Sequence, residues 1–413
     1  MPLLSPPKDE LKILLLEGIH ANAVDQFKND GFANVVTHAK ALDAADLKEA
    51  IRDAHVIGIR SRTKLTEDIL SAAESLVAIG CFCIGTNQVN LDAARTMGIP
   101  VFNAPYSNTR SVAELVLAEA IMLMRGVPEK SKLAHDGVWL KSADQSHEIR
   151  GKVLGIVGYG HIGSQLSIMA ESLGMQVRYR DIETKLSMGN ATPVSSLDEL
   201  LESSDVVSLH VPSTPETKGM IGEAEIRRMK PGSHLINASR GDVVDLEALA
   251  RALGDGHIRG AAVDVFPKEP ASAQEALQTP LRGFGNVILT PHVGGSTQEA
   301  QENIGTEVAE KLIRYMDHGA TVGAVNFIEA ALPVRGGRTR FVHVHKNVPG
   351  VLSRINEVFS DRGMNIAGQY LQTDGQLGFA VVDIDTDEPL EAGLGIRRDL
   401  QDIEGTIRVR FLY

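Results

Sequence analysis

The chain has 413 residues, of which 43% are hydrophobic and 4% aromatic, a composition typical of globular α/β proteins with two or three domains. Its 41 basic and 53 acidic residues give a net charge of −12, which argues against nucleic acid or an anionic membrane as a partner. An anionic substrate would therefore need a local basic pocket.

The apolar run that begins at Leu11 is too short for a signal sequence or a membrane span, and no later run reaches spanning length. The only cysteines, Cys81 and Cys83, lack the framework of a secreted disulfide protein and are expected to be small buried side chains. Both observations favour a cytoplasmic protein.

The first hundred residues alternate short apolar strands with helical stretches, which predicts parallel βα units. Strands are expected at 12–17, 55–61, 76–85 and 99–105, and helices at 43–54 and 66–75. A long helix should follow, because Ser111 and Glu114 form a capping box before an apolar stretch that ends at Gly126. This helix is apolar around most of its circumference, which favours burial between domains or subunits.

The alternation starts afresh at Gly151 and predicts a doubly wound dinucleotide-binding domain. Its six strands are expected at 152–158, 175–181, 205–211, 233–239, 260–266 and 286–291. A second capping box, Ser296 to Glu299, opens a helix that ends near Gly319 and would return the chain to the first domain.

The last part of the chain reads strand, helix, strand, strand, helix, strand, which is the ferredoxin-like βαββαβ order. Asp374–Gly375 is a hairpin signal and supports the two central strands of this order. Gly393 and Gly395 weaken the prediction of its second helix. The predicted domains are a discontinuous flavodoxin-like substrate domain, a Rossmann dinucleotide domain, a hinge containing Gly336 and Gly337, and a regulatory domain. Their boundaries are 1–107 with 300–333, 108–299, 334–338 and 339–413.

A glycine pattern follows the first strand of the second domain. Gly158, Gly160 and Gly163 have G-x-G-x-x-G spacing between an apolar strand and a helix, where the helix N-terminus would bind a pyrophosphate. Asp181 ends the next strand, where a carboxylate accepts a hydrogen bond from the ribose of NAD and repels the extra phosphate of NADP. Arg178 and Arg180 leave NADP open as an alternative.

Three polar residues lie near the ends of later strands of this domain: Arg240, Glu269 and His292. Each alone is ordinarily a surface ion pair, a solvated acid or a loop histidine. Together, at the strand ends where α/β sheets bind ligands, they predict a catalytic site. No second histidine or cysteine lies at ligand spacing from His292, so no metal is expected.

Four stretches carry a family resemblance: GYGHIG, NASRGDVVD, AAVDVFPKEP and LTPHVGGST. Residues 11 to about 330 resemble the dehydrogenases that act on D-isomers of 2-hydroxy acids, and the tail that begins HVHKNVPGVLSRI resembles an ACT domain. The resemblance implies that His292 transfers the hydroxyl proton, that Glu269 orients and stabilises its imidazole, and that Arg240 holds the substrate carboxylate.

The resemblance also implies further contacts. Cofactor contacts are expected, besides the glycines, Asp181, Arg240 and His292, from His161, Ile162, Ala238, Ser239, Asp264, Val293, Gly294 and Gly295. Substrate contacts are expected from Arg60, Ser61, Asn108 and, with less support, Lys141. His345, Asn347 and Asn365 would bind L-serine as an effector, although capping, turn and solvent-facing strand roles are the simpler interpretation.

The resemblance implies NAD-dependent oxidation of D-3-phosphoglycerate to 3-phosphohydroxypyruvate, inhibited by L-serine, with side reduction of 2-oxoglutarate, in a homo-oligomer that is expected to be a tetramer. Two alternatives stay open. One is reduction of another 2-oxo acid such as glyoxylate or hydroxypyruvate. The other is a non-enzymatic, NADH-gated corepressor-like binding protein.

Overall fold

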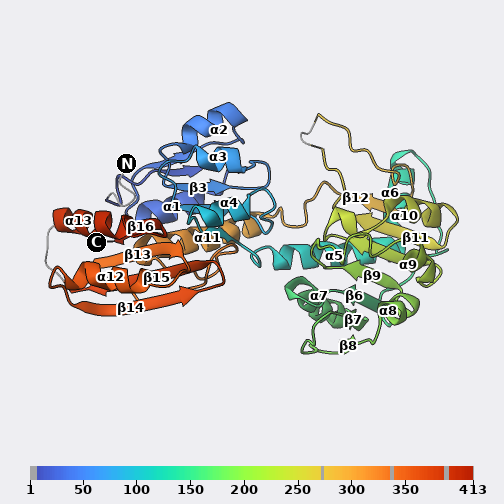
Figure 1. Cartoon of the computed structure of the whole chain (residues 1–413). Helices are drawn as coiled ribbons and strands as arrows, with labels where there is room; N and C mark the ends of the chain where they lie inside the picture. Colours follow the sequence, from blue (N-terminus) through green and yellow to red (C-terminus); the bar gives the residue numbers. More distant parts are fainter. Residues whose placement is uncertain (1–6, 271–273, 335–338, 386–389, 413) are drawn as a thin grey trace. The chain divides into compact units, whose positions relative to one another are not determined.

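The computed structural model describes residues 7–270, 274–334, 339–385 and 390–412. The chain folds into two compact units (Figure 1), residues 1–107 with 301–413 and residues 108–300. Within the described ranges no helix is long and apolar enough to cross a lipid bilayer. Gly336 and Gly337 of the predicted hinge lie outside the described residues.

The first unit contains a five-stranded parallel sheet with the order β2-β1-β3-β4-β5, the flavodoxin-like order. Four of the strands were expected, whereas β2 is a short, half-exposed edge strand with little apolar pattern. The strands are β1 (Ile13–Leu15), β2 (Val35–Thr37), β3 (Val56–Ile59), β4 (Ala78–Cys81) and β5 (Val101–Asn103). The helices are α1 (Ala21–Asn29), α2 (Ala44–Ile51), α3 (Glu67–Ser71), α4 (Leu91–Thr96) and the returning α11 (Gln298–His318).

Helix α11 packs on this sheet, although it lies some two hundred residues further along the chain. A Cβ at Gly80 of β4 would lie 2.7 Å from Leu312 Cδ1 and 2.9 Å from Val308 Cγ1. The glycine therefore permits the close approach of α11 to the sheet. Helices α1 and α11 cover one face, and α2, α3 and α4 cover the other.

The second unit is built on a seven-stranded parallel sheet with the order β12-β11-β10-β9-β6-β7-β8, a doubly wound arrangement. The six expected strands are present, and the two-residue β8 adds an edge. The strands are β6 (Val153–Val157), β7 (Gln176–Arg180), β8 (Thr192–Pro193), β9 (Val206–Leu209), β10 (Ser233–Asn237), β11 (Ile258–Val263) and β12 (Val287–Leu289).

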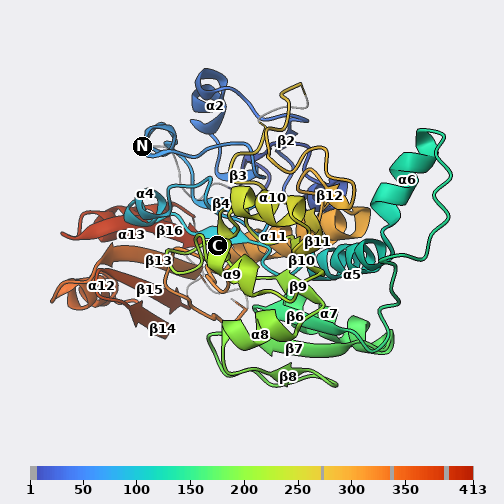
Figure 2. The same ribbon diagram turned by 90° about the vertical axis from the view of Figure 1, so that its right-hand side faces the viewer.

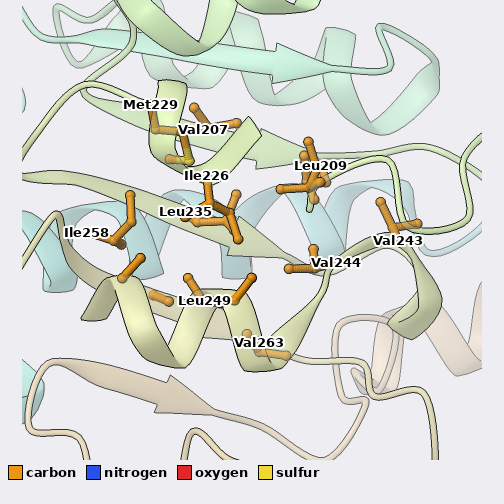
Figure 3. Close-up of a cluster of buried hydrophobic side chains, with 14 of the residues drawn as sticks. Val207, Leu209, Ile226, Met229, Leu235, Val243, Val244, Leu249, Ile258 and Val263 are labelled. Carbon is orange, nitrogen blue, oxygen red and sulfur yellow. The ribbon is translucent and has the colours of Figure 1, made fainter. Parts of the chain in front are cut away.

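Helices cover both faces of this sheet. One face packs against α5 and α7, and the other against α8, α9 and α10. Figure 3 shows side chains of β9, β10 and β11, such as Leu209, Leu235 and Val263, in the second of these cores with Leu249 of α10. The helices are α5 (Thr109–Arg125), α6 (Val127–His135), α7 (His161–Ser172), α8 (Leu197–Ser203), α9 (Glu223–Arg228), α10 (Leu246–Gly254) and a 3₁₀ turn at Gly241–Val243.

The C-terminal part forms the expected βαββαβ fold with an antiparallel sheet of order β14-β15-β13-β16. Both views place β14 at the edge of this sheet (Figures 1 and 2). Gly393 lies within the second helix, where a Cβ would meet the ring of Phe411 at 2.3 Å. The elements are β13 (Thr339–Lys346), α12 (Val351–Ser360), β14 (Ile366–Thr373), β15 (Leu377–Ile384), α13 (Leu390–Gln401) and β16 (Thr406–Leu412).

Both expected capping boxes are wrong. Helix α5 begins at Thr109, and the hydroxyl of Ser111 lies 2.7 Å from that of Thr297 instead of capping the helix. Helix α11 is capped by Thr297, whose Oγ1 accepts a hydrogen bond from the N–H of Ala300 at 3.1 Å. The spacing of a serine and an acid is a local signal, and it does not show that a hydroxyl can instead bind a residue far away in the chain, as Ser111 does with Thr297.

Cys81 is buried and Cys83 half-buried, and neither forms a disulfide. Cys83 therefore differs from the small buried side chain that was expected. Its Sγ also lies 3.1 Å from the carbonyl oxygen of Gly85, which is a polar neighbour.

Candidate active site

The glycine turn between β6 and α7 has the geometry that a bound pyrophosphate requires. Gly158 has a φ of 93°, and a Cβ there would lie 2.6 Å from the carbonyl oxygen of His210. A Cβ at Gly163 would lie 2.4 Å from the carbonyl oxygen of Gly158, whereas the space at Gly160 is open. Helix α7 begins at His161 with no side-chain cap, and the N-terminus of a helix favours the binding of a phosphate.

Asp181 lies directly after β7, beside this turn. Its Oδ2 accepts a hydrogen bond from the N–H of Tyr159 at 2.7 Å, and its Oδ1 accepts one from the N–H of Glu183 at 3.0 Å. Each carboxylate oxygen can accept a second bond, so a ribose hydroxyl can still be bound. The residues present therefore fit an adenine dinucleotide.

His292 and Glu269 form a hydrogen-bonded pair beyond the ends of β12 and β11. His292 Nδ1 lies 2.9 Å from Glu269 Oε1 and 3.1 Å from Oε2. This contact raises the pKa of the His292 imidazole, against the opposing effect of burial, and the same hydrogen bond lowers the pKa of Glu269. The pairing leaves Nε2 as the nitrogen for proton exchange.

The backbone of His292 is strained, since its φ of 55° lies in the left-handed region. Strained residues of this kind gather at functional sites, where the surrounding structure holds them in place. Here the N–H of His292 donates to the carbonyl oxygen of Asp264 at 2.8 Å.

Asp264 is buried and anchors the loop that carries His292. Its Oδ1 accepts hydrogen bonds from Thr290 Oγ1 at 2.6 Å and from the N–H of Val293 at 2.8 Å, and its Oδ2 accepts one from the N–H of Gly294 at 2.8 Å. The family resemblance implied a cofactor contact for this side chain. These hydrogen bonds make Asp264 a positioning residue for the loop, and its cofactor contact stays a prediction.

Arg240 lies close enough to the pair for its charge to lower the pKa values of both His292 and Glu269. Its Nη1 donates to the carbonyl oxygen of its own neighbour Ser239 at 2.7 Å. Ser239 in turn donates to Asn237 Oδ1 through its N–H and its hydroxyl, and Asn237 Nδ2 donates to the carbonyl oxygen of Arg240 at 3.0 Å. These bonds hold the 237–240 turn, with Ala238, beside the pair.

Gly294 and Gly295 allow the loop to pack closely. A Cβ at Gly294 would lie 3.0 Å from Asp264 Oδ2, and one at Gly295 would lie 2.3 Å from Asn108 Nδ2. The Oδ1 of Asn108 is buried and has no hydrogen-bond partner among the described residues. Asn108 therefore contacts the loop of His292 and keeps one free acceptor there.

Glu119 was not singled out from the sequence. It lies on the buried face of α5, 1% exposed, and neither carboxyl oxygen has a hydrogen-bond partner within the described ranges. Burial, and secondly the charge of Asp264, raises its pKa to about 8. Glu119 is therefore largely neutral at pH 7 and does not oppose the charge of Asp264. An acid within an apolar helix face was the only available signal.

The expected substrate residues lie in both units. Arg60 and Ser61 follow β3 in the first unit, and Asn108 and Lys141 belong to the second. Lys141 is exposed in an irregular segment beside Trp139, whose side chain is 87% exposed.

The three expected effector residues do not meet within one chain. His345 pairs with Gly378, and the N–H of Asn347 donates to the carbonyl oxygen of Gln376, at one end of the C-terminal sheet. Asn365 precedes Ile366, which pairs with Ile384 at the opposite end. His345 is also 3% exposed, which excludes the solvent-facing alternative.

Comparison with known proteins agrees with these features. The D-isomer specific 2-hydroxyacid dehydrogenase NAD binding domain matches residues 117–294, and the AHAS small subunit-like ACT domain matches residues 341–408. The chain is 60% identical to D-3-phosphoglycerate dehydrogenase of Escherichia coli (strain K12), and the alignment covers 100% of both chains. It is 57% identical to the protein of that name from Haemophilus influenzae over 98% of both chains.

A solved structure supports the fold. D-lactate dehydrogenase from Aquifex aeolicus, complexed with NAD and lactic acid, matches 74% of this chain and 95% of its own with a TM-score of 0.64 at 28% identity. The chain therefore belongs to the D-3-phosphoglycerate dehydrogenases of the D-isomer specific 2-hydroxyacid dehydrogenase family and carries an ACT domain in its C-terminal part.

Proposed function

We propose that the chain catalyses the NAD-dependent oxidation of D-3-phosphoglycerate to 3-phosphohydroxypyruvate, the first step of L-serine biosynthesis. The observation that carries this proposal is the 2.9 Å contact between His292 and Glu269 in the unit that also contains an intact dinucleotide turn. The full-length identity of 60% to a D-3-phosphoglycerate dehydrogenase supports the choice of substrate.

In the proposed mechanism, His292 Nε2 removes the hydroxyl proton from C2 of the substrate, and the imidazolium that forms is stabilised by Glu269. Arg240 binds the substrate carboxylate with two parallel donors. Gly158, Gly160 and Gly163, with His161, Ile162 and Asp181, would hold NAD, which would supply the acceptor for the hydride of C2. Arg60 and Ser61 bind the substrate phosphate, with Asn108 and Lys141 as further contacts.

The test is direct. Purified protein mixed with NAD and D-3-phosphoglycerate should produce NADH absorbance, most strongly when the product is trapped. Faster turnover of glyoxylate or hydroxypyruvate than of D-3-phosphoglycerate would favour the alternative, a reductase of another 2-oxo acid. No turnover with any 2-hydroxy or 2-oxo acid would leave only the corepressor-like binding role. Reduction of 2-oxoglutarate is proposed as a side activity.

We further propose L-serine as a feedback inhibitor that binds the ACT domain through His345, Asn347 and Asn365. Because Asn365 lies at the other end of the sheet from the first two, the site would combine residues of two copies, in keeping with the proposed homotetramer. L-serine should lower turnover in the same assay, and turnover that ignores serine would contradict only this part. The free thiols of Cys81 and Cys83 support a cytoplasmic location.

Replacing Glu269 by glutamine is expected to shift the acidic limb of the pH profile of kcat/KM for oxidation to lower pH. The proton acceptor must be neutral imidazole, so the rate rises as the pH passes through the pKa of His292. The Glu269 carboxylate raises the pKa of His292. Its removal therefore lowers this pKa and moves the acidic limb of the profile to lower pH.

The profile is measured with saturating NAD from pH 5 to 9. Glu247→Gln, an exposed acid on α10, is the control and should keep the parent profile. An acidic limb that stays in place or moves to higher pH would contradict the proposed pairing.

A further inference from the structure

The substrate unit has a topological switch point between β1 and β3, where the order of the strands reverses. In flavodoxin-like sheets, ligands bind at the carboxyl ends of the strands at this point. Glu17 lies two residues after β1, and Arg60 and Ser61 follow β3 on the neighbouring strand. An acid and the expected phosphate-binding residues therefore lie side by side.

Glu17 binds the loop after β3 through its main chain. Its Oε1 accepts hydrogen bonds from the N–H groups of Arg60 at 3.1 Å and Thr63 at 2.8 Å, and its Oε2 accepts one from Arg62 at 2.9 Å. Hydrogen bonds to a carboxylate are stronger than those between neutral groups. The backbone of Glu17 has a φ of 64°, so the chain holds a strained conformation to present this side chain.

The same loop is held from its other side by Gln88, which is 7% exposed. Its Nε2 donates to the carbonyl oxygen of Arg60 at 2.8 Å and lies 3.1 Å from that of Gly85. Both backbone polar groups of Arg60 are thus bound by side chains. The guanidinium of Arg60 has no hydrogen-bond or ion-pair partner among the residues the structure describes, so it is available to a ligand.

We propose that Glu17, assisted by Gln88, is a positioning residue that sets the backbone of residues 60–63 and thereby aims Arg60 and Ser61 at the phosphate of the substrate. The inference rests on the proposed function. Glu17 itself does not contact the substrate in this proposal. Its carboxylate accepts the hydrogen bonds of three backbone N–H groups in the loop. The guanidinium of Arg60 is then the group that remains to bind the substrate anion.

The test is Glu17→Gln in the full chain, with KM for D-3-phosphoglycerate and kcat measured separately. The amide keeps the size of the side chain but cannot accept all three N–H bonds. Displacement of the loop should raise KM by about 10- to 100-fold, since small misplacements of a positioning group have effects of this order. The value of kcat should change by less than about threefold, because an interaction shared by the ground and transition states affects KM alone.

Asp43→Asn is the matched control. Asp43 also accepts two backbone N–H bonds, from Ala45 and Asp46 at 3.0 Å each, in the same unit but at the start of α2. This variant should keep the parent KM. NADH affinity, measured by fluorescence, should be unchanged in both variants.

A double-mutant cycle with Arg60→Ala separates positioning from a general loss of structure. If Glu17 acts through Arg60, Glu17→Gln should raise KM by less than about twofold in the Arg60→Ala background. An equal increase in both backgrounds, or a parent KM in the single variant, overturns the inference while leaving the proposed function intact. If Glu17→Gln does not fold, Gln88→Leu is the deciding variant, with the same expected KM effect and the same cycle. A parent chain without turnover overturns the proposed function and this inference with it.

Discussion

Replacing His292 by asparagine is expected to lower kcat by about 10²- to 10⁴-fold, the usual contribution of a general acid–base group. Asparagine cannot accept the proton but tolerates the left-handed backbone at this position, where φ is 55°. The loop should therefore keep its fold, and NADH affinity should be retained because the glycine turn after β6 is unchanged.

Steady-state kinetics in both directions and NADH fluorescence titration check this expectation. His257→Asn is a suitable control, since His257 lies in the same unit and its Nε2 lies 3.0 Å from the carbonyl oxygen of Ile226, within α9. A variant at His292 that turns over at the parent rate while it binds NADH would show that another group moves the proton.

Replacing Asp383 by asparagine is expected to lower the free energy of unfolding of the C-terminal part by about 3–5 kcal/mol, the cost of leaving one buried charge without its partner. Arg340 Nε and Nη2 donate to the two carboxylate oxygens of Asp383 at 2.5 and 2.6 Å, and the two side chains are 0% and 5% exposed. Arg340 Nη1 also donates to the carbonyl oxygens of His318 and Pro333. The pair therefore ties the end of α11 to the C-terminal sheet.

Denaturant unfolding followed by far-UV circular dichroism measures this loss. The double variant Arg340→Met with Asp383→Leu should recover most of it, because an apolar pair of similar volume avoids the desolvation of both charges. Asp53→Asn, which breaks a surface ion pair with Lys12, should cost less than about 1 kcal/mol. A loss at Asp383 as small as that at Asp53 would contradict the assigned burial.

Local patterns predicted the features that depend on neighbouring residues. The apolar alternation identified all six expected strands of the dinucleotide unit, and the βαββαβ order of the tail is confirmed, with the turn at Asp374 accepting N–H bonds from Gln376 and Leu377. The glycine spacing at 158–163 predicted the tight turn because the backbone conformation at Gly158 is a local requirement.

Contacts between distant residues were decided only by the tertiary structure. Ser111 matched a capping pattern, yet its hydroxyl meets Thr297, 186 residues away. No local pattern indicated that the carboxylate of Asp264 anchors the loop of His292. Glu17 gave no signal in the sequence, because its three N–H partners follow a different strand.

The sequence by itself therefore determined the two parallel sheets, the dinucleotide turn and the set of residue types available for catalysis. The tertiary structure decided contacts that no pattern predicted: that Asp264 anchors the loop of His292, that Glu119 is buried near Asp264, and that Asn365 lies apart from His345. The physical reason is range. Periodicity and turn preferences act over a few residues, whereas hydrogen bonds and charge interactions depend on how strands order themselves in the sheets.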